Sequence, residues 1–167
     1  RGTPNRSGIR SFRVKPKGAF FEMVDEDQPL WKILATDVQF GPDGAMYVSD
    51  WVNGWNGEGK GRLYRFVDKD AQRDALRKQV SSLLSTGLEQ KKVDEVAKLL
   101  KHADQRVRQM AQFALVGRNA VDALLQAVAQ TDHQLARIHG VWGLGQLARD
   151  KSADPRIAAR MGALLSD

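Results

Sequence analysis

Short apolar runs separated by glycine and proline fill the first 67 residues of the chain. The central example is the turn Gly-Pro-Asp-Gly at 41–44, between apolar runs at 38–40 and 45–48. Proline fixes φ at about −65° and glycine accepts a positive φ, so this tetrapeptide favours a tight reversal between antiparallel strands. The expected strands are 9–14, 19–24, 36–40, 45–49 and 62–67, with a turn at 15–18 and a polar break at 25–29. Five short strands without a helical period predict an antiparallel β unit.

The apolar period changes to that of a helix after Val67. Residues 68–85 carry apolar or small side chains at helical spacing, and Gly87 supplies a stop. From Asp94 onward the expected helices come in pairs. The first helices are expected at 96–101 and 123–130, and the second helices follow Asp104 and Asp132, each of which is expected to be the N-cap. The second helices are expected to bury Val107, Met110, Ala111, Ala114 and Leu115 in one pair, and Leu135, Ile138, Trp142 and Leu147 in the next.

The helix pairs recur at a nearly constant interval. Asp104 and Asp132 are 28 residues apart, and Arg108 and Arg137 are 29 residues apart. A repeat of about thirty residues is within reach of a two-helix unit, so the pattern predicts a short α-solenoid. We interpret Arg108 and Arg137 as structural residues of the turns. Asp154 is expected to cap a further helix at 157–165.

Composition narrows the class of protein. A chain of 167 residues with 42% hydrophobic and 28% charged residues is typical of a globular protein. Cysteine is absent, which excludes disulfides, thiolate metal sites and covalently attached haem within these residues. The net charge of +6 is dispersed, and no basic helix with interleaved aromatics is present, so no nucleic-acid partner is expected. The chain starts at Arg1 and stops in an unfinished repeat, which we interpret as a fragment of a longer protein.

The connection between the last two expected strands, residues 50–61, is long and unusual in composition. It interleaves two tryptophans and several polar side chains with four glycines. Glycines let the backbone bend sharply, and loops of this kind often carry binding sites. The alternative is that Trp51 and Trp55 close the end of the β core. The three histidines, His102, His133 and His139, have no metal-ligand spacing and are expected to have surface or packing roles.

Two segments resemble known families. Residues 36–51, Thr-Asp-Val-Gln-Phe-Gly-Pro-Asp-Gly-Ala-Met-Tyr-Val-Ser-Asp-Trp, resemble the inner two strands of a blade in the propellers of soluble sugar dehydrogenases. The helix pairs, with Asp and Arg near each turn, resemble HEAT repeats over 93–167. Their succession is similar to the exported or membrane-associated dehydrogenase-like proteins of Planctomycetes and Bacteroidetes. In that group a propeller and a HEAT array precede a c-type cytochrome domain with a Cys-x-x-Cys-His motif, which this chain lacks.

The resemblance implies a fold class and a domain organisation. The expected fold is α+β in two parts, a partial antiparallel β-propeller made of the last blades, followed by an α-solenoid of HEAT-like helix pairs. The expected domains are the C-terminal part of a propeller at 1–67, a linking helix at 68–92 and truncated HEAT-like repeats at 93–167. A propeller blade has four strands, so the strand at 62–67 is expected to be left as an unpaired edge.

The blade resemblance also implies candidate site residues. Asp37 and Asp50 are expected to lie at the face of the propeller that carries the site, as a general base, as metal ligands or as hydrogen-bonding groups for a hydroxylated substrate. For every candidate the alternative is a hydrogen bond or salt bridge that fixes a loop. The candidate substrate-binding residues are Trp51 and Trp55, which would stack on a ring, Asn53, and Lys60 and Arg62, which would counter an anion.

Two functions follow. The resemblance implies that the parent is an exported dehydrogenase that oxidises a sugar or related alcohol and passes electrons to a haem c domain outside these residues. PQQ or Ca²⁺ as a cofactor rests on the resemblance alone, and no cofactor is assignable within the chain. The alternative is a non-catalytic carbohydrate- or protein-binding scaffold.

The expected partners are a carbohydrate or polyol, the rest of the same polypeptide and a protein on the HEAT repeats. The expected location is periplasmic, cell-surface or secreted, and the fragment alone is expected to be inactive.

Overall fold

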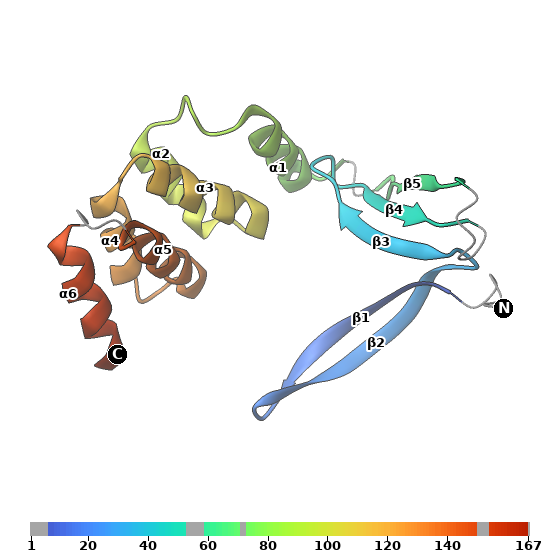
Figure 1. Cartoon of the computed structure of the whole chain (residues 1–167), viewed down its shortest axis with the longest axis horizontal. Helices are drawn as coiled ribbons and strands as arrows, with labels where there is room; N and C mark the ends of the chain where they lie inside the picture. Colours follow the sequence, from blue (N-terminus) through green and yellow to red (C-terminus); the bar gives the residue numbers. More distant parts are fainter. Residues whose placement is uncertain (1–6, 53–58, 71–72, 150–153, 167) are drawn as a thin grey trace. The chain divides into compact units, whose positions relative to one another are not determined.

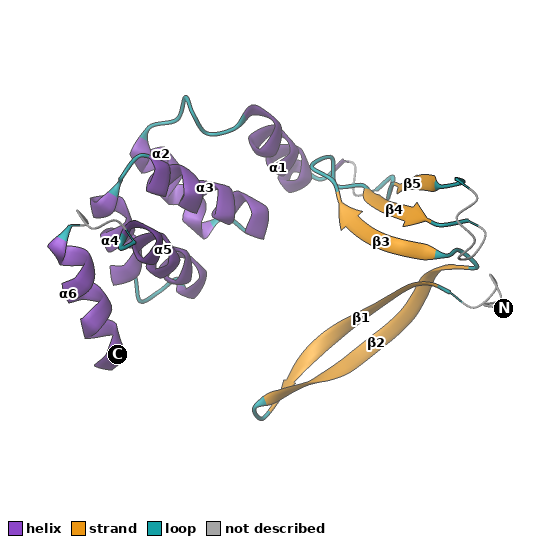
Figure 2. Ribbon diagram, viewed as in Figure 1, coloured by secondary structure: helices purple, strands orange, loops and turns teal. Residues whose placement is uncertain are grey.

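The computed structural model describes residues 7–52, 59–70, 73–149 and 154–166. These residues form a mixed α+β chain with two small antiparallel sheets and six α-helices, and neither sheet closes into a barrel (Figures 1 and 2). The chain divides into two compact units, residues 1–78 and 79–167, and each is considered by itself. The α+β prediction is therefore confirmed. None of the described helices is both long and apolar enough to cross a membrane.

The first sheet is a long hairpin of β1 (Gly8–Lys17) and β2 (Phe20–Trp31). Its turn lies at residues 18–19, with Gly18 at a φ of 61°. The expected turn at 15–18 and the expected polar break at 25–29 are wrong. The polar residues stay in the strand because they pair across it: Arg13 contacts Asp25 at 2.5 Å, and Arg10 contacts Glu26 at 2.5 Å.

The second sheet is the hairpin predicted around residues 41–44, extended by one strand. β3 (Ala35–Phe40), β4 (Met46–Asp50) and β5 (Arg62–Phe66) follow in the order β3-β4-β5, so β5 lies at an edge as expected. Gly44 has a φ of 72°, and its N–H donates to the carbonyl of Gly41 at 3.0 Å. The turn is thus confirmed. Arg65 contacts the Asp43 carboxylate at 2.7 Å and is the main cause of the lowered pKa of that carboxyl.

The helices end close to the expected places and, except for the first, also begin close to them. The helix expected from residue 68 begins only at Ala75. They are α1 (Ala75–Thr86), α2 (Val93–Lys98), α3 (Gln105–Gly117), α4 (Val121–Ala129), α5 (Gln134–Leu147) and α6 (Pro155–Ala163), with short 3₁₀ turns at Leu99–Lys101 and Leu164–Ser166. Asp104 and Asp154 cap α3 and α6, each accepting a hydrogen bond from the backbone N–H two residues on. The expected cap at Asp132 is wrong, because His133 Nδ1 accepts from the N–H of Ala136 instead.

The core of the helical unit confirms one predicted face and corrects the other. In α3 the predicted residues Val107, Ala111 and Leu115 are fully buried, and the predicted residues Met110 and Ala114 are half-buried against the same core. In α5 the prediction is wrong for Leu135 and Trp142, which are 45% and 55% exposed. The residues that α5 buries are Ala136, His139, Gly140, Gly143 and Leu144.

Two glycines explain why α5 turns this face inward. A Cβ atom at Gly143 would lie 2.7 Å from Leu124 Cδ2, and one at Gly140 would lie 3.0 Å from Val128 Cγ2. Both neighbours belong to α4, so the small residues let α5 approach α4 closely. The large apolar residues of α5 then lie outside this contact.

We predict that Gly143→Ala is less stable than Gly145→Ala by about 1–3 kcal/mol, because only the first methyl group overpacks the α4 contact. A Cβ at Gly145 meets nothing within 4 Å, and both substitutions gain the same helix propensity. Urea unfolding followed by far-UV circular dichroism measures the difference. Equal midpoints for the two variants would show that the close approach is absent.

Candidate functional site

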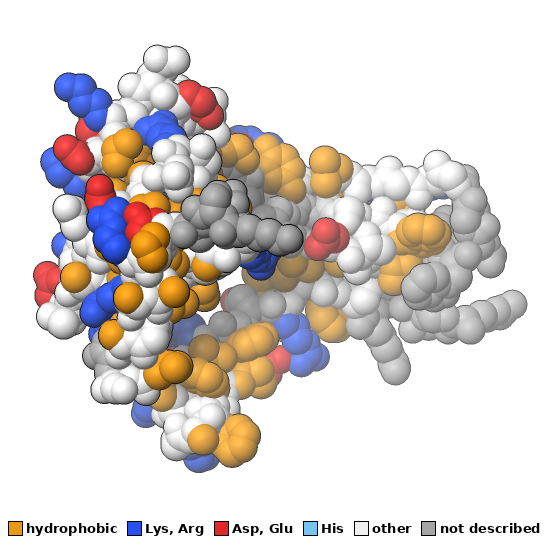
Figure 3. All heavy atoms as spheres, turned by 60° about the vertical axis from the view of Figure 1, so that its left-hand side comes forward, with side chains coloured by type: hydrophobic (Ala, Val, Ile, Leu, Met, Phe, Trp, Pro, Cys, Tyr) orange, Lys and Arg blue, Asp and Glu red, His pale blue; other side chains and the backbone are white. Residues whose placement is uncertain are grey.

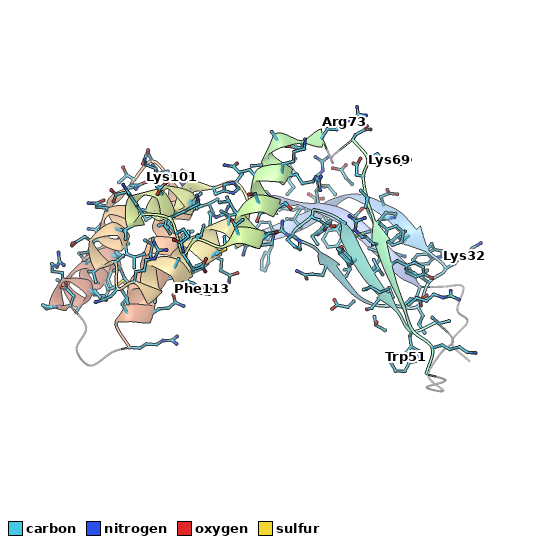
Figure 4. The ribbon with its side chains drawn as sticks, turned by 90° about the horizontal axis from the view of Figure 1, so that it is seen from above. Lys32, Trp51, Lys69, Arg73, Lys101 and Phe113 are labelled. Carbon is cyan, nitrogen blue, oxygen red and sulfur yellow. The ribbon has the colours of Figure 1, made fainter. Side chains whose placement is uncertain are left out.

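The end of the second sheet gathers part of the predicted site in a cleft of about 590 Å³. Its lining residues are Thr36, Ser49, Asp50, Trp51, Gly59, Lys60, Gly61, Arg62 and Leu63. The structure therefore brings together Asp50, Trp51, Lys60 and Arg62, and Trp51 is 43% exposed just beyond β4 (Figure 4). Asn53 and Trp55 lie outside the described residues.

Asp50 is held by hydrogen bonds within this unit. The residue is only 6% exposed. Its Oδ1 accepts from the N–H of Leu34 at 3.1 Å and from that of Val52 at 2.9 Å. The Tyr64 hydroxyl donates to Oδ2 at 3.3 Å. A carboxylate with these partners joins the residue before β3, the residues after β4 and a residue of β5. These bonds match the alternative stated for Asp50, a hydrogen bond that fixes a loop.

Asp37 lies apart from this arrangement. Its side chain is exposed, and its Oδ1 accepts from the N–H of Val38 at 2.7 Å. Asp37 is opposite Ser49 in the sheet, whereas Asp50 is opposite Ala35, with a register shift between the two pairs. The two carboxylates share no hydrogen-bond partner among the described residues. Their catalytic roles stay predictions.

A second hollow, which the sequence analysis does not predict, lies on the helical unit. This groove has a volume of about 490 Å³, within the range of ligand sites. Its residues are Gln105, Gln109, Gln112 and Phe113 of α3, His139, Val141, Trp142, Gly145 and Gln146 of α5, and Arg149 and Met161. Phe113, labelled in Figure 4, is 50% exposed and Trp142 is 55% exposed.

A chain of hydrogen bonds runs from the interior of α3 to this groove. Arg108, 7% exposed, donates from Nη1 to the carbonyls of His102 and Ala103, each at 2.7 Å. Its Nε lies 3.4 Å from His139 Nε2. Because a guanidinium can only donate, this contact makes Nε2 the acceptor and Nδ1 the protonated nitrogen of His139.

The same donor-to-acceptor direction of the hydrogen bonds continues from His139 to Gln146. The Nδ1–H of His139 donates to Gln112 Oε1 at 2.8 Å. Gln112 Nε2 in turn donates to Gln146 Oε1 at 2.9 Å. The side-chain amide nitrogen of Gln146, a residue of the groove wall, is therefore the last donor of the chain.

The same histidine positions an aromatic residue of the groove. The rings of His139 and Trp142 meet edge to face, with centroids 5.2 Å apart. Burial, with the Arg108 guanidinium beside the ring, lowers the pKa of His139. The neutral tautomer that the hydrogen bonds require is thus the form that the fold favours.

Comparisons with known proteins give no further assignment: no family model, curated protein or solved structure matches this chain. Within the described ranges no group of three or more His, Asp or Glu side chains is placed to hold a metal ion. The site is therefore argued from its own geometry.

Sequence reasoning missed the groove, although two signals mark it. Phe113 and Trp142 are 29 residues apart, the same interval as Arg108 and Arg137. At that interval Met110 corresponds to His139, so a polar residue replaces an apolar one at a core position. A histidine at a position that is apolar in the preceding repeat requires buried hydrogen-bond partners, which here are Arg108 and Gln112.

We predict that Asp50→Ala lowers the free energy of unfolding by about 1–3 kcal/mol, because it leaves two backbone N–H groups without their acceptor. The matched change Asp37→Ala removes an exposed carboxylate and is expected to stay within about 0.5 kcal/mol of the parent. Urea unfolding followed by tryptophan fluorescence measures both variants. Similar losses in the two would contradict the structural role of Asp50.

We predict that the helical unit loses stability as the pH falls from about 7 to 5. An unfolded histidine has a pKa of about 6.5, and the pKa of folded His139 is lower. Protons therefore bind the unfolded state first, and the stability present above the unfolded pKa is lost on acidification. Urea midpoints across this window should fall less steeply for His139→Gln than for Gly145→Ala, which changes no titratable group. Equal pH dependence of the urea midpoints in the two variants would show that His139 is not the group responsible for the loss of stability.

Proposed function

We propose that this chain is a non-catalytic, protein-binding scaffold whose helical unit binds an extended peptide segment in the groove between α3 and α5. The observation that carries the proposal is the pair of half-exposed aromatic side chains, Phe113 and Trp142, at equivalent positions of successive helix pairs. Exposed aromatic side chains beside fixed hydrogen-bond donors are the usual anchors of peptide grooves.

The surface of the helical unit is consistent with such a role. Figure 3, in which this unit is turned forward, shows hydrophobic side chains reaching the surface among charged ones. Among the large exposed apolar residues of this unit, Phe113 and Trp142 line one groove together with Val141 and Met161, whereas Leu135 and Leu165 do not line it. A lining that combines aromatic and aliphatic side chains with oriented polar groups favours binding over simple solvation.

We further propose that the helix pairs are HEAT-type repeats and that β3, β4 and β5 are strands of a propeller blade. The pairs α2 with α3 and α4 with α5, offset by about 29 residues, support the first part. The three-stranded meander with its central turn supports the second. Oxidation of a sugar or alcohol by a longer protein, electron transfer to haem c and export stay predictions, since no geometry among the described residues bears on them.

The proposal is tested by selecting a library of displayed random peptides on the full 167-residue chain. We expect enriched peptides whose binding is lost in the double variant Phe113→Ala/Trp142→Ala. The matched control is Leu135→Ala, which removes a half-exposed apolar side chain of α5 that does not line the groove. Circular dichroism verifies that each variant folds. No enrichment, or binding that survives the double variant, would overturn the proposal.

A further inference from the structure

We propose that one face of the hairpin formed by β1 and β2 is an interface that pairs two copies of this chain. The inference concerns the first compact unit and does not rest on the groove between α3 and α5. Three observations carry it: the exposure of the hairpin, the separation of its apolar and charged side chains onto opposite faces, and the distribution of its charges over the two strands.

The register of the hairpin places one set of apolar side chains on a single face. Paired residues of an antiparallel ladder share a face, as do alternate residues of one strand. Val14 pairs with Met23, and Pro16 pairs with Phe21. Phe12 precedes Val14 by two residues, and the extra residue at the neighbouring register shift lies on β2, so Phe12 shares their face. We call these five residues the apolar face.

The apolar face is open to solvent. Every residue at 10–17 and 20–29 except Val24 is exposed, so no third layer of described residues covers the hairpin. A two-stranded hairpin without such a layer is only marginally stable in water. A partner that covers the face therefore also stabilises the hairpin.

The size of the apolar face suits a symmetric pair. Phe21 is 68% exposed, and Phe12, Val14 and Met23 are each more than half exposed. With about 150–250 Å² for a large side chain, these residues leave roughly 400–500 Å² of apolar surface uncovered, a size at which a patch is often functional. Two such faces offer roughly 900 Å², and their rims bring the total to the ~1,000 Å² of a specific interface.

The charges of the hairpin favour a second copy over a strongly charged partner. The hairpin has four basic and four acidic residues, Arg10, Arg13, Lys15 and Lys17 on β1, and Glu22, Asp25, Glu26 and Asp27 on β2. Arg13 contacts Asp25 at 2.5 Å and Lys17 contacts Glu22 at 3.6 Å, so opposite charges neutralise each other within the hairpin. Four positive and four negative charges give no net attraction to an anionic lipid surface or a nucleic acid.

The same charges decide how two copies meet. Pairing of two β1 edges would set basic side chains against basic ones, and pairing of two β2 edges would set acidic side chains against acidic ones. Pairing of β1 with β2 of the next copy would not close and would add copies without limit. Face-to-face packing about a two-fold axis parallel to the strands places β1 of each copy over β2 of the other. Unlike charges then meet at the rims, and the assembly stops at two copies.

The experiment is analytical ultracentrifugation of the full chain at about 1–100 µM, with two matched variants. Phe20, 79% exposed, pairs with Lys17 and therefore lies on the face opposite to that of its neighbour Phe21. Phe21→Ser and Phe20→Ser each remove one phenylalanine from the end of the hairpin, with the same loss of strand propensity. We expect the parent to form a dimer. Phe21→Ser is expected to raise its dissociation constant by about tenfold or more, and Phe20→Ser is expected to leave it unchanged.

A cysteine measurement tests the interface without removing an aromatic side chain. The chain has no cysteine, so an introduced thiol can form a disulfide only with another copy. Val14→Cys mixed with Met23→Cys is expected to give disulfide-linked dimers under an added oxidant, because the two positions lie opposite each other across the two-fold pair. Lys15→Cys mixed with Glu22→Cys is the control on the other face and is expected to react about tenfold more slowly.

The outcomes separate this interface from the other candidates. A monomer at every concentration, equal effects of the two serine variants, or equal rates for the two cysteine pairs would overturn the inference. Assemblies larger than two copies would overturn it in favour of edge-to-edge pairing. Binding of the monomer to vesicles of phosphatidylcholine and phosphatidylserine, lost in Phe21→Ser, would overturn it and assign the face to lipid. A monomer that still selects displayed peptides would overturn the interface and leave the scaffold proposal standing.

Discussion

The buried guanidinium of Arg108 is the constraint on which the helical unit depends. A charge that is 7% exposed requires partners for its donors, and Arg108 finds them in the carbonyls before α3 and in His139 of α5. Because a guanidinium cannot accept, it sets the tautomer of His139 and the orientation of each amide beyond it. One buried side chain thus fixes the approach of two helices and the polarity of the groove between them.

This network requires a close and specific approach of α5 to its neighbours. Gly140 and Gly143 provide it, since neither places a side chain against α4. The same rotation of α5 that buries His139 leaves Trp142 at the surface, packed edge to face on the histidine ring. The exposure of Trp142 is therefore a consequence of how α5 packs in the core. The contact with His139 also holds its ring in one orientation at the groove.

Features that depend on neighbouring residues could be predicted from the sequence, and features that depend on distant ones could not. The turn at Gly44 and the cap at Asp104 are local, and both are confirmed. The continuation of β2 through Asp25 and Glu26 depends on ion pairs with β1, and the inward face of α5 depends on glycines packing on α4. An apolar stripe at the right period reveals a helix but not which face is buried when the buried face consists of small residues and a histidine. The sequence identifies Asp50 as a candidate site residue. Its hydrogen-bond partners at Leu34 and Tyr64 are distant in the sequence and could not be predicted from it.

The two hollows differ in what their polar groups can offer a ligand. At the end of the sheet, the Asp50 carboxylate accepts three hydrogen bonds from its own unit, so its capacity is largely used in holding strands together. On the helical unit the hydrogen bonds all run outward, from Arg108 through His139 and Gln112 to Gln146. The side-chain nitrogen of Gln146 has no acceptor within the part of the chain that the structure describes. Residue types alone mark the first hollow as the richer site, with its Asp, Trp and basic side chains. The direction of the hydrogen bonds favours the groove on the helical unit as the binding site. Recognition requires a polar group, here the amide nitrogen of Gln146, that is fixed in position and can still donate a hydrogen bond to a ligand.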